Sequence, residues 1–64
     1  MRSYDFELMR VGQTVRNRKN GRRYEILGFD RDPHQFGVQD DMLATLKPLD
    51  GGKDVRVKVT NLEF

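Results

Sequence analysis

The sequence predicts an all-β protein, a single small barrel of five short strands. Alternating apolar residues recur in short runs, most clearly in Val55-Arg56-Val57-Lys58-Val59, and such alternation is typical of half-buried strands. Residues that favour turns, chiefly Gly, Asp, Asn and Pro, separate these runs. No stretch has the spacing of a long amphipathic helix, and short strands joined by tight turns favour a barrel over a sandwich.

Length and composition restrict the protein further. The chain has 64 residues and no Cys, so neither disulfides nor thiolate metal ligands can stabilise a domain near the lower size limit. No apolar run has the length of a membrane span or of a signal-peptide core. We therefore expect a cytoplasmic protein of modest stability that does not contact membranes.

Residues 1–10 are expected to form an N-terminal arm before a barrel of residues 11–64. Tyr4, Phe6 and Leu8 alternate in this arm. The arm is expected to be extended or to make a single turn that lays Phe6 and Leu8 over an open end of the core. Gly12 suits a sharp bend into the first strand, where Val15 would point inward.

The first two strands are expected to meet in a hairpin at Asn20-Gly21. This dipeptide favours a type I′ turn, in which both central residues have positive φ. Tyr24 and Ile26 would then share one face of the second strand, while Phe29 lies on the other. A change of core face near Gly28 would make this strand long and strongly bent. Five cations surround the turn: Arg16, Arg18, Lys19, Arg22 and Arg23.

The rest of the chain is expected to supply a turn at 30–34, a short strand at 36–39 and a further strand at 42–49 that ends near its proline. A second hairpin turn at 50–53 would lead to the last strand at 55–60. The three valines of that strand would face the core.

Beyond the turns, Arg56 and Lys58 of the last strand would face solvent. Leu62 or Phe64 is expected to fill the remaining space in the core. If the last strand lies beside the first, Arg56 and Lys58 would extend the basic surface of the hairpin.

Several short motifs together suggest a family. They are Gly12-x-x-Val15, the Arg-rich turn, Tyr24-x-Ile26-x-Gly28-Phe29, the alternating valine strand and Asn61-Leu62-Glu63. Over roughly residues 11–63 the chain resembles SH3-like barrels of the KOW and Tudor type. The resemblance implies a binding module without chemistry of its own. KOW-like members bind RNA, ribosomes or polymerase, and Tudor-like members bind methylated side chains or nucleic acid.

The sequence departs from both patterns. Only Asn20-Gly21 represents the Gly-rich turn of a KOW motif. A Tudor cage needs several convergent rings, and at least two of the available aromatic residues are expected to be in the core. These aromatic residues are Tyr4, Tyr24, Phe29 and Phe36.

Phosphate binding is the function that the basic hairpin favours. Arginine is suited to it because its guanidinium fork can grip a phosphate with two hydrogen bonds. Tyr24 would either stack on an exposed base or be a core ring with its hydroxyl at the rim, and burial favours the second. The plain alternative is a solvated turn whose charges serve solubility and protect a sheet edge.

Catalysis and metal binding are not expected. His34 lies beside Asp30 and Asp32, but an Asp-Pro turn explains this cluster without a metal ion. Asp40 and Asp41 would point to opposite faces of a strand, so they would not form a working carboxylate pair. We expect no enzyme activity and no cofactor.

The leading hypothesis is therefore a module that contacts nucleic acid, preferably RNA or a nucleoprotein, through the hairpin. The alternative is a protein-interaction adaptor or inhibitor, such as a phage- or plasmid-type accessory factor, that docks on a host protein. Charge segregation motivates it, because residues 10–31 carry seven cations and two acids whereas residues 32–54 carry five acids and two lysines. We expect a monomer or weak homodimer. The acidic docking residues would be Asp40, Asp41, Asp50 and Asp54.

Overall fold

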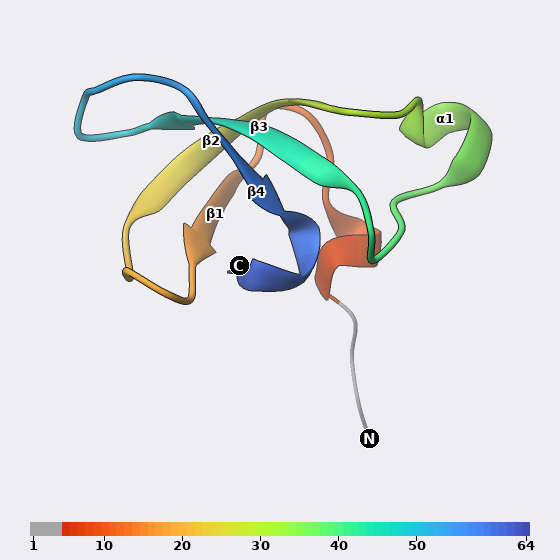
Figure 1. Cartoon of the computed structure of the whole chain (residues 1–64), viewed down its shortest axis with the longest axis horizontal. Coiled ribbons are helices and arrows are strands. Elements are labelled where there is room, and N and C mark those ends of the chain that lie inside the picture. Colours follow the sequence, from red (N-terminus) through yellow and green to blue (C-terminus); the bar gives the residue numbers. More distant parts are fainter. Residues whose placement is uncertain (1–4) are drawn as a thin grey trace.

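One antiparallel sheet makes up most of the protein. The computed structural model describes residues 5–64, and its strands follow the order β4-β3-β2-β1-β5 across the sheet (Figure 1). The expected all-β class and the number of five strands are confirmed, although within residues 5–64 no hydrogen bonds join β4 to β5 and close the sheet. The strands are β1 (Thr14–Asn17), β2 (Arg23–Phe29), β3 (Leu43–Pro48), β4 (Val55–Lys58) and β5 (Leu62–Glu63).

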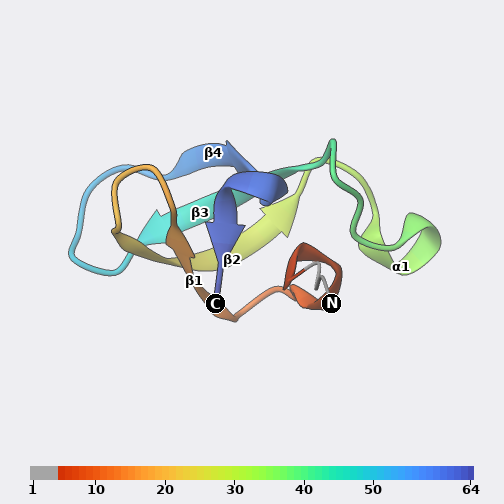
Figure 2. The same cartoon turned by 90° about the horizontal axis from the view of Figure 1, so that it is seen from below.

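Three single helical turns accompany the strands. They are η1 (Asp5–Leu8), α1 (Pro33–Phe36) and η2 (Val59–Asn61). Two views show α1 standing away from the strands at one end of the sheet (Figures 1 and 2). Among the described residues, no helix has the length and apolar character needed to cross a membrane.

The second strand bends as expected. Tyr24 and Ile26 are buried, and the pairing register between β2 and β3 shifts between Ile26 and Gly28. A register shift of this kind is a β-bulge, which bends the strand and changes the direction in which later side chains point. Phe29 consequently packs against the core. The expected change of core face near Gly28 is confirmed.

A link through η2 brings the end of the chain back to its first strand. Val59 of η2 is fully buried, and its N–H donates to the carbonyl of Met42 (3.1 Å). The chain then continues into β5, which pairs with β1 (Figure 2). Because Leu62 is also fully buried, it is the residue of the last four that fills the core, while Phe64 remains 52% exposed.

Ten buried apolar side chains form the core, and the Val, Leu, Ile and Met side chains among them each contribute roughly 1.5–3 kcal/mol on burial. The N-terminal arm contributes through Phe6, which packs against the core, and through Met9, which is fully buried. The expectation for Leu8 is wrong, because the turn of η1 leaves it 65% exposed. Tyr4 lies outside the described residues. The core residues are Met9, Val15, Tyr24, Ile26, Val38, Met42, Ala44, Leu46, Val59 and Leu62.

The strand expected at 36–39 is not formed. Pro33 begins the helical turn α1, where its fixed φ suits the first helical position and its missing N–H costs nothing. Gly37 ends this turn with φ of +72°, and its N–H donates to the carbonyl of Pro33 (2.9 Å). Val38 still reaches the core from the loop that follows. The third strand is therefore β3, and the fifth is β5.

The valine strand is shorter than expected, and only one of its two valines packs against the core. β4 ends at Lys58, so Val59 reaches the core from η2 rather than from a strand. Val57 packs against the core, but Val55 is 38% exposed. β4 is an edge strand, and fewer neighbours cover its beginning than would cover a central strand.

Candidate nucleic-acid interface

The basic hairpin has a longer loop than the two-residue turn that the sequence predicts. β1 ends at Asn17, and the N–H of this residue donates to the carbonyl of Arg22 (2.9 Å). The N–H of Gly21 donates back to the carbonyl of Asn17 (2.7 Å), which closes a wider turn. Gly21 has a φ of +72°. Within residues 5–64 only glycines have positive φ, so Asn20 does not have one. The expected type I′ turn is therefore wrong, because Asn20 does not adopt the required conformation.

Two asparagine side chains hold this loop in shape. Asn17 is buried, and its Oδ1 accepts a hydrogen bond from the N–H of Lys19 (2.9 Å). The Oδ1 of Asn20 accepts one from the N–H of Arg22 (2.8 Å). Asparagine favours such local turns because its side chain reaches the backbone two residues further on. Asn17 was missed in the sequence, where its position just before a basic turn was the available signal.

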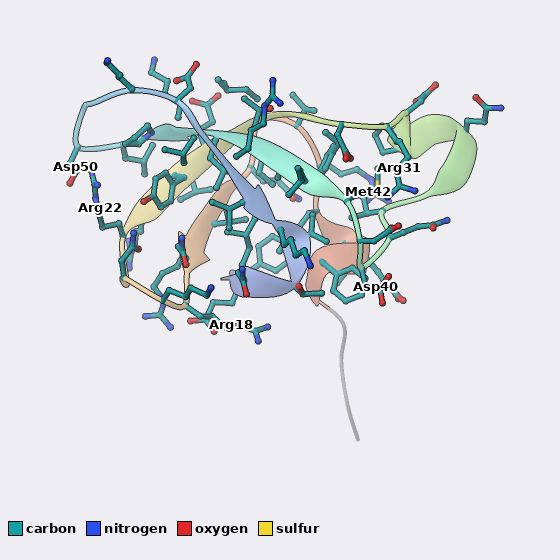
Figure 3. The ribbon with its side chains drawn as sticks, viewed as in Figure 1. Arg18, Arg22, Arg31, Asp40, Met42 and Asp50 are labelled. Atoms are coloured by element: carbon teal, nitrogen blue, oxygen red, sulfur yellow. The ribbon has the colours of Figure 1, made fainter. Side chains whose placement is uncertain are left out.

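The side chain of Arg22 is held at the end of the molecule by Asp50 and by the ring of Tyr24. Its Nη2 donates to Oδ1 of Asp50 (2.6 Å) in the β3–β4 loop, and its guanidinium carbon lies 5.7 Å from the centroid of the Tyr24 ring. The Nδ2 of Asn20 donates to the Tyr24 hydroxyl (3.0 Å). Figure 3 shows Arg22 and Asp50 side by side at this end. The hydrogen bond between them lowers the pKa of Asp50 and raises that of Arg22.

Tyr24 is a core residue with a polar rim. Its side chain is 3% exposed, and its hydroxyl bonds to Asn20. The ring therefore supports Arg22 and has no open face for a nucleic-acid base. This is the arrangement that burial favoured at the sequence level.

Arg16 and Arg18 share a carboxylate with β5. Arg16 is the register partner of Glu63, and its Nε donates to Oε2 of that residue (2.7 Å) while its Nη2 contacts the same oxygen. The Nε of Arg18 lies 3.5 Å from the other carboxylate oxygen. Both arginines remain exposed, so Glu63 offsets part of their charge without covering them.

The remaining two cations of the hairpin have no carboxylate partner among residues 5–64. Lys19 and Arg23 are exposed, and neither forms an ion pair with any of residues 5–64. Arg23 is the register partner of Arg16 on the neighbouring strand. Two guanidinium groups therefore face solvent from adjacent positions, and of the two only Arg16 forms an ion pair among residues 5–64.

The outer face of the sheet, which is the face turned away from the core, carries further cations. Arg56 and Lys58 pair in register with Thr45 and Leu43, and these β3 positions alternate with the buried Ala44. They therefore share the outer face with Arg16 and Arg23. Their expected place beside the first strand is wrong, because β4 pairs with β3 at the opposite edge of the sheet.

Lys47 was missed in the sequence. It is an exposed residue of β3 and alternates with the buried Leu46 and Pro48. Its register partner on β2 is Glu25. A lysine between two buried strand positions was the signal that would have placed it on the outer face.

The four acidic residues do not form one face. Asp50 and Asp54 lie in the β3–β4 loop near the hairpin, whereas Asp40 and Asp41 precede β3. Figure 3 shows Asp50 and Asp40 at opposite ends of the molecule. Asp41 is also paired, since the Nη2 of Arg31 lies 2.5 Å from its Oδ1 and lowers its pKa.

The turn around His34 has a structural explanation where it is described. Oδ1 of Asp30 accepts a hydrogen bond from the N–H of Leu43 (3.1 Å), which joins the end of β2 to β3. The side chain of His34 lies outside the described residues, as does that of Phe36. In the described part of the chain, no group of three or more acidic or histidine side chains is placed to hold a metal ion.

The aromatic residues are also accounted for where the structure describes them. Tyr24 is buried and Phe29 packs against the core. The expectation that at least two of the candidate cage residues belong to the core is confirmed.

Known proteins do not supply a closer identification. Comparison with models of protein families finds no match to this chain. Comparisons with curated proteins and with solved structures also find none. The geometry described above is therefore the basis for a functional proposal.

Proposed function

We propose that this protein is a non-catalytic module that contacts nucleic acid, RNA or a nucleoprotein in preference, through its basic hairpin. The observation that carries the proposal is the surplus of exposed cations on this hairpin. Among the residues that the structure describes, its five cations pair with two carboxylates, those of Glu63 and Asp50, and Lys19 and Arg23 pair with neither. Nucleic-acid phosphates are ligands that such a surplus attracts.

We propose further that the chain is an SH3-like barrel of the KOW or Tudor type. Three features support this. Gly12 has positive φ and leads into β1, and β2 is long and bent by a bulge. The short terminal strand β5 lies beside β1. The absence of a family match leaves this assignment as a proposal.

The binding mode would be phosphate contact and shape, with little reading of base sequence. Guanidinium and ammonium groups dominate the hairpin, and contacts of this type fix position rather than sequence. The asparagines that could read base edges are engaged in the loop itself, since Asn17 and Asn20 both bond to its backbone.

Fluorescence anisotropy with single-stranded RNA, single-stranded DNA and duplex probes, each at low and physiological salt, tests the proposal. We expect micromolar or tighter binding that weakens steeply with salt. The double variant Arg22→Gln/Arg23→Gln should weaken binding to every sequence and flatten the salt dependence. Arg10→Gln/Arg31→Gln removes the same charge at exposed positions outside the hairpin and its neighbouring loop, and should change binding less. Equal binding by the two double variants would remove the hairpin from the interface.

The alternative function, docking on a protein, has one observation in its favour. Leu49 and Val55 are exposed apolar residues on either side of a loop that carries Asp50 and Asp54. Mixed apolar and charged surfaces of this kind occur at protein interfaces. Flat titrations with all three probes at both salts would discard nucleic-acid binding and leave this loop as the surface to test.

A further inference from the structure

A small hollow lies at the edge of the hairpin, on the outer side of β1. It is lined by Thr14, Val15, Arg16, Arg23 and Phe64. Three strands meet there, because β1 pairs with β2 on one side and with β5 on the other. Residues distant in the sequence thus converge on one site that the sequence alone did not indicate.

The charges in this hollow are unbalanced. Arg23 and Arg16 are register partners, and such partners in an antiparallel pair lie about 4.5–5.5 Å apart at Cα. Like charges directly opposite one another destabilise a sheet. Glu63 pairs with both Arg16 and Arg18, and Arg23 forms no ion pair within residues 5–64. A bound anion beside Arg23 would relieve this repulsion.

An aromatic ring completes the hollow. Phe64 follows β5 and is 52% exposed, although it lines the same site as the two arginines. The ring is not part of the buried core, to which β5 contributes Leu62. An exposed ring beside an unpaired guanidinium presents an apolar surface and a phosphate ligand within one site.

We infer that this hollow binds one unstacked nucleotide of a single-stranded nucleic acid, with its base against Phe64 and its phosphate on Arg23. The inference rests on the proposed nucleic-acid function and assigns the ligand class. Base stacking on an aromatic side chain tolerates any sequence, since every base has a π-face. A base inside a duplex is stacked on its neighbours and is not free to reach the ring. Single strands are therefore preferred over duplexes.

Paired probes test the role of the base separately from that of the phosphate. The first probe is a short single strand of uridines, and the second is the same strand with abasic sugars at its centre, which keeps every phosphate. We expect the first to bind roughly tenfold more tightly, as one base–aromatic stack would provide. Phe64→Ala should abolish this difference, whereas Leu49→Ala, which removes a side chain of similar exposure (54%), should preserve it.

A tryptophan provides an independent readout. The chain contains no Trp, so Phe64→Trp introduces a single fluorophore at the site. We expect the uridine strand to quench its emission and to bind at least as tightly as it binds the parent protein. The abasic strand should bind without quenching.

The outcomes separate this inference from the proposed function. If both probes bind equally and Phe64→Ala changes neither, the nucleotide site is wrong while nucleic-acid binding stands. If neither probe binds at low salt, the proposed function fails and the inference fails with it. A tenfold preference that Phe64→Ala removes, together with quenching by the uridine strand alone, would establish the site.

Discussion

The two ends of the sheet are tied in the same way but carry different charge. At the hairpin end, Arg22 bonds to Asp50 across two loops (2.6 Å). At the α1 end, Arg31 lies 2.5 Å from a carboxylate oxygen of Asp41 and 3.9 Å from one of Asp30. Arg31 at the α1 end thus has two neighbouring carboxylates. The five cations of the hairpin pair with only two carboxylates among residues 5–64.

This difference in paired charge indicates which end of the sheet would bind an anionic ligand. An arginine that its own chain surrounds with carboxylates serves to join two segments. A hairpin whose cations lack carboxylate partners has a positive electrostatic potential that attracts anions, and salt screens this potential. The two ends therefore resemble each other in their arginine–carboxylate ties but differ in how much of their positive charge is paired. Variants at matched positions test whether this difference matters for binding.

The largest effect is expected from Met42→Ala, at the α1 end. Met42 is fully buried, and its carbonyl accepts the hydrogen bond from Val59 that joins η2 to the sheet. Removing the side chain should lower the free energy of unfolding by about 2–5 kcal/mol. Domains of this length are stable by only roughly 3–10 kcal/mol, so partial unfolding is expected.

Urea unfolding followed by circular dichroism measures this loss. Leu49→Ala, an exposed site at the hairpin end, serves as the control and should change stability by less than about 0.5 kcal/mol. Equal midpoints for the two variants would show that the α1 end does not depend on Met42.

Two glycines with the same conformation test the ends against each other. Gly21 in the hairpin and Gly37 after α1 both have φ of +72°, and a Cβ at either would meet no atom within 4 Å. Alanine at each should therefore cost about 1 kcal/mol from backbone strain alone. Gly28→Ala is the control, since this glycine is equally uncrowded but lacks positive φ. Thermal unfolding that differs clearly between Gly21→Ala and Gly37→Ala would reveal that one end also depends on something beyond strain.

The hairpin end was predicted best, because its signals are local. Asn20-Gly21 located the turn, and the alternation after it placed Tyr24 and Ile26 in the core. The number of loop residues was not predictable, since it depends on the side-chain bonds of Asn17 and on the pairing of β1 with β2. The partners of the arginines were not predictable either. Asp50 and Glu63 are distant in sequence and come to the hairpin only through the sheet order.

The α1 end was predicted poorly, because two local signals competed there. Phe36 and Val38 alternate as in a strand, but Pro33 and Gly37 favour the beginning and the end of a helical turn. The turn formed, and Val38 reached the core without a strand. Alternation over only two apolar residues was too weak to outweigh a proline and a glycine at suitable spacing. The basic surface was predicted as a set of residues but not as a hollow, since Phe64 joins it through the pairing of β5 with β1.

A smaller effect is expected on binding from Asp50→Asn. If the hairpin binds nucleic acid as proposed, the carboxylate of Asp50 would compete with phosphate for Arg22. Its neutralisation should then tighten RNA binding roughly two- to fivefold at physiological salt. The salt dependence should steepen by about one phosphate contact. Asp41→Asn makes the same change at the α1 end and should leave both quantities unaltered. Anisotropy titrations that show equal gains for both variants would attribute the effect to net charge and not to the hairpin.

The smallest effect is expected from acid. Hydrogen bonds from Arg22 and Arg31 hold the pKa values of Asp50 and Asp41 below the ordinary value. A carboxyl whose pKa is lower in the folded state contributes stability above its unfolded pKa of about 3.9, and this contribution is lost as pH falls through the folded pKa. Both groups are exposed to solvent, so each loss should be slight.

Thermal unfolding between neutral pH and pH 2 should show that Asp50→Asn and Asp41→Asn each flatten the acid limb by a similar small amount. A large change for Asp50→Asn alone would mean that the Arg22 contact holds the hairpin in place, and the two ends would then differ in structure as well as in charge.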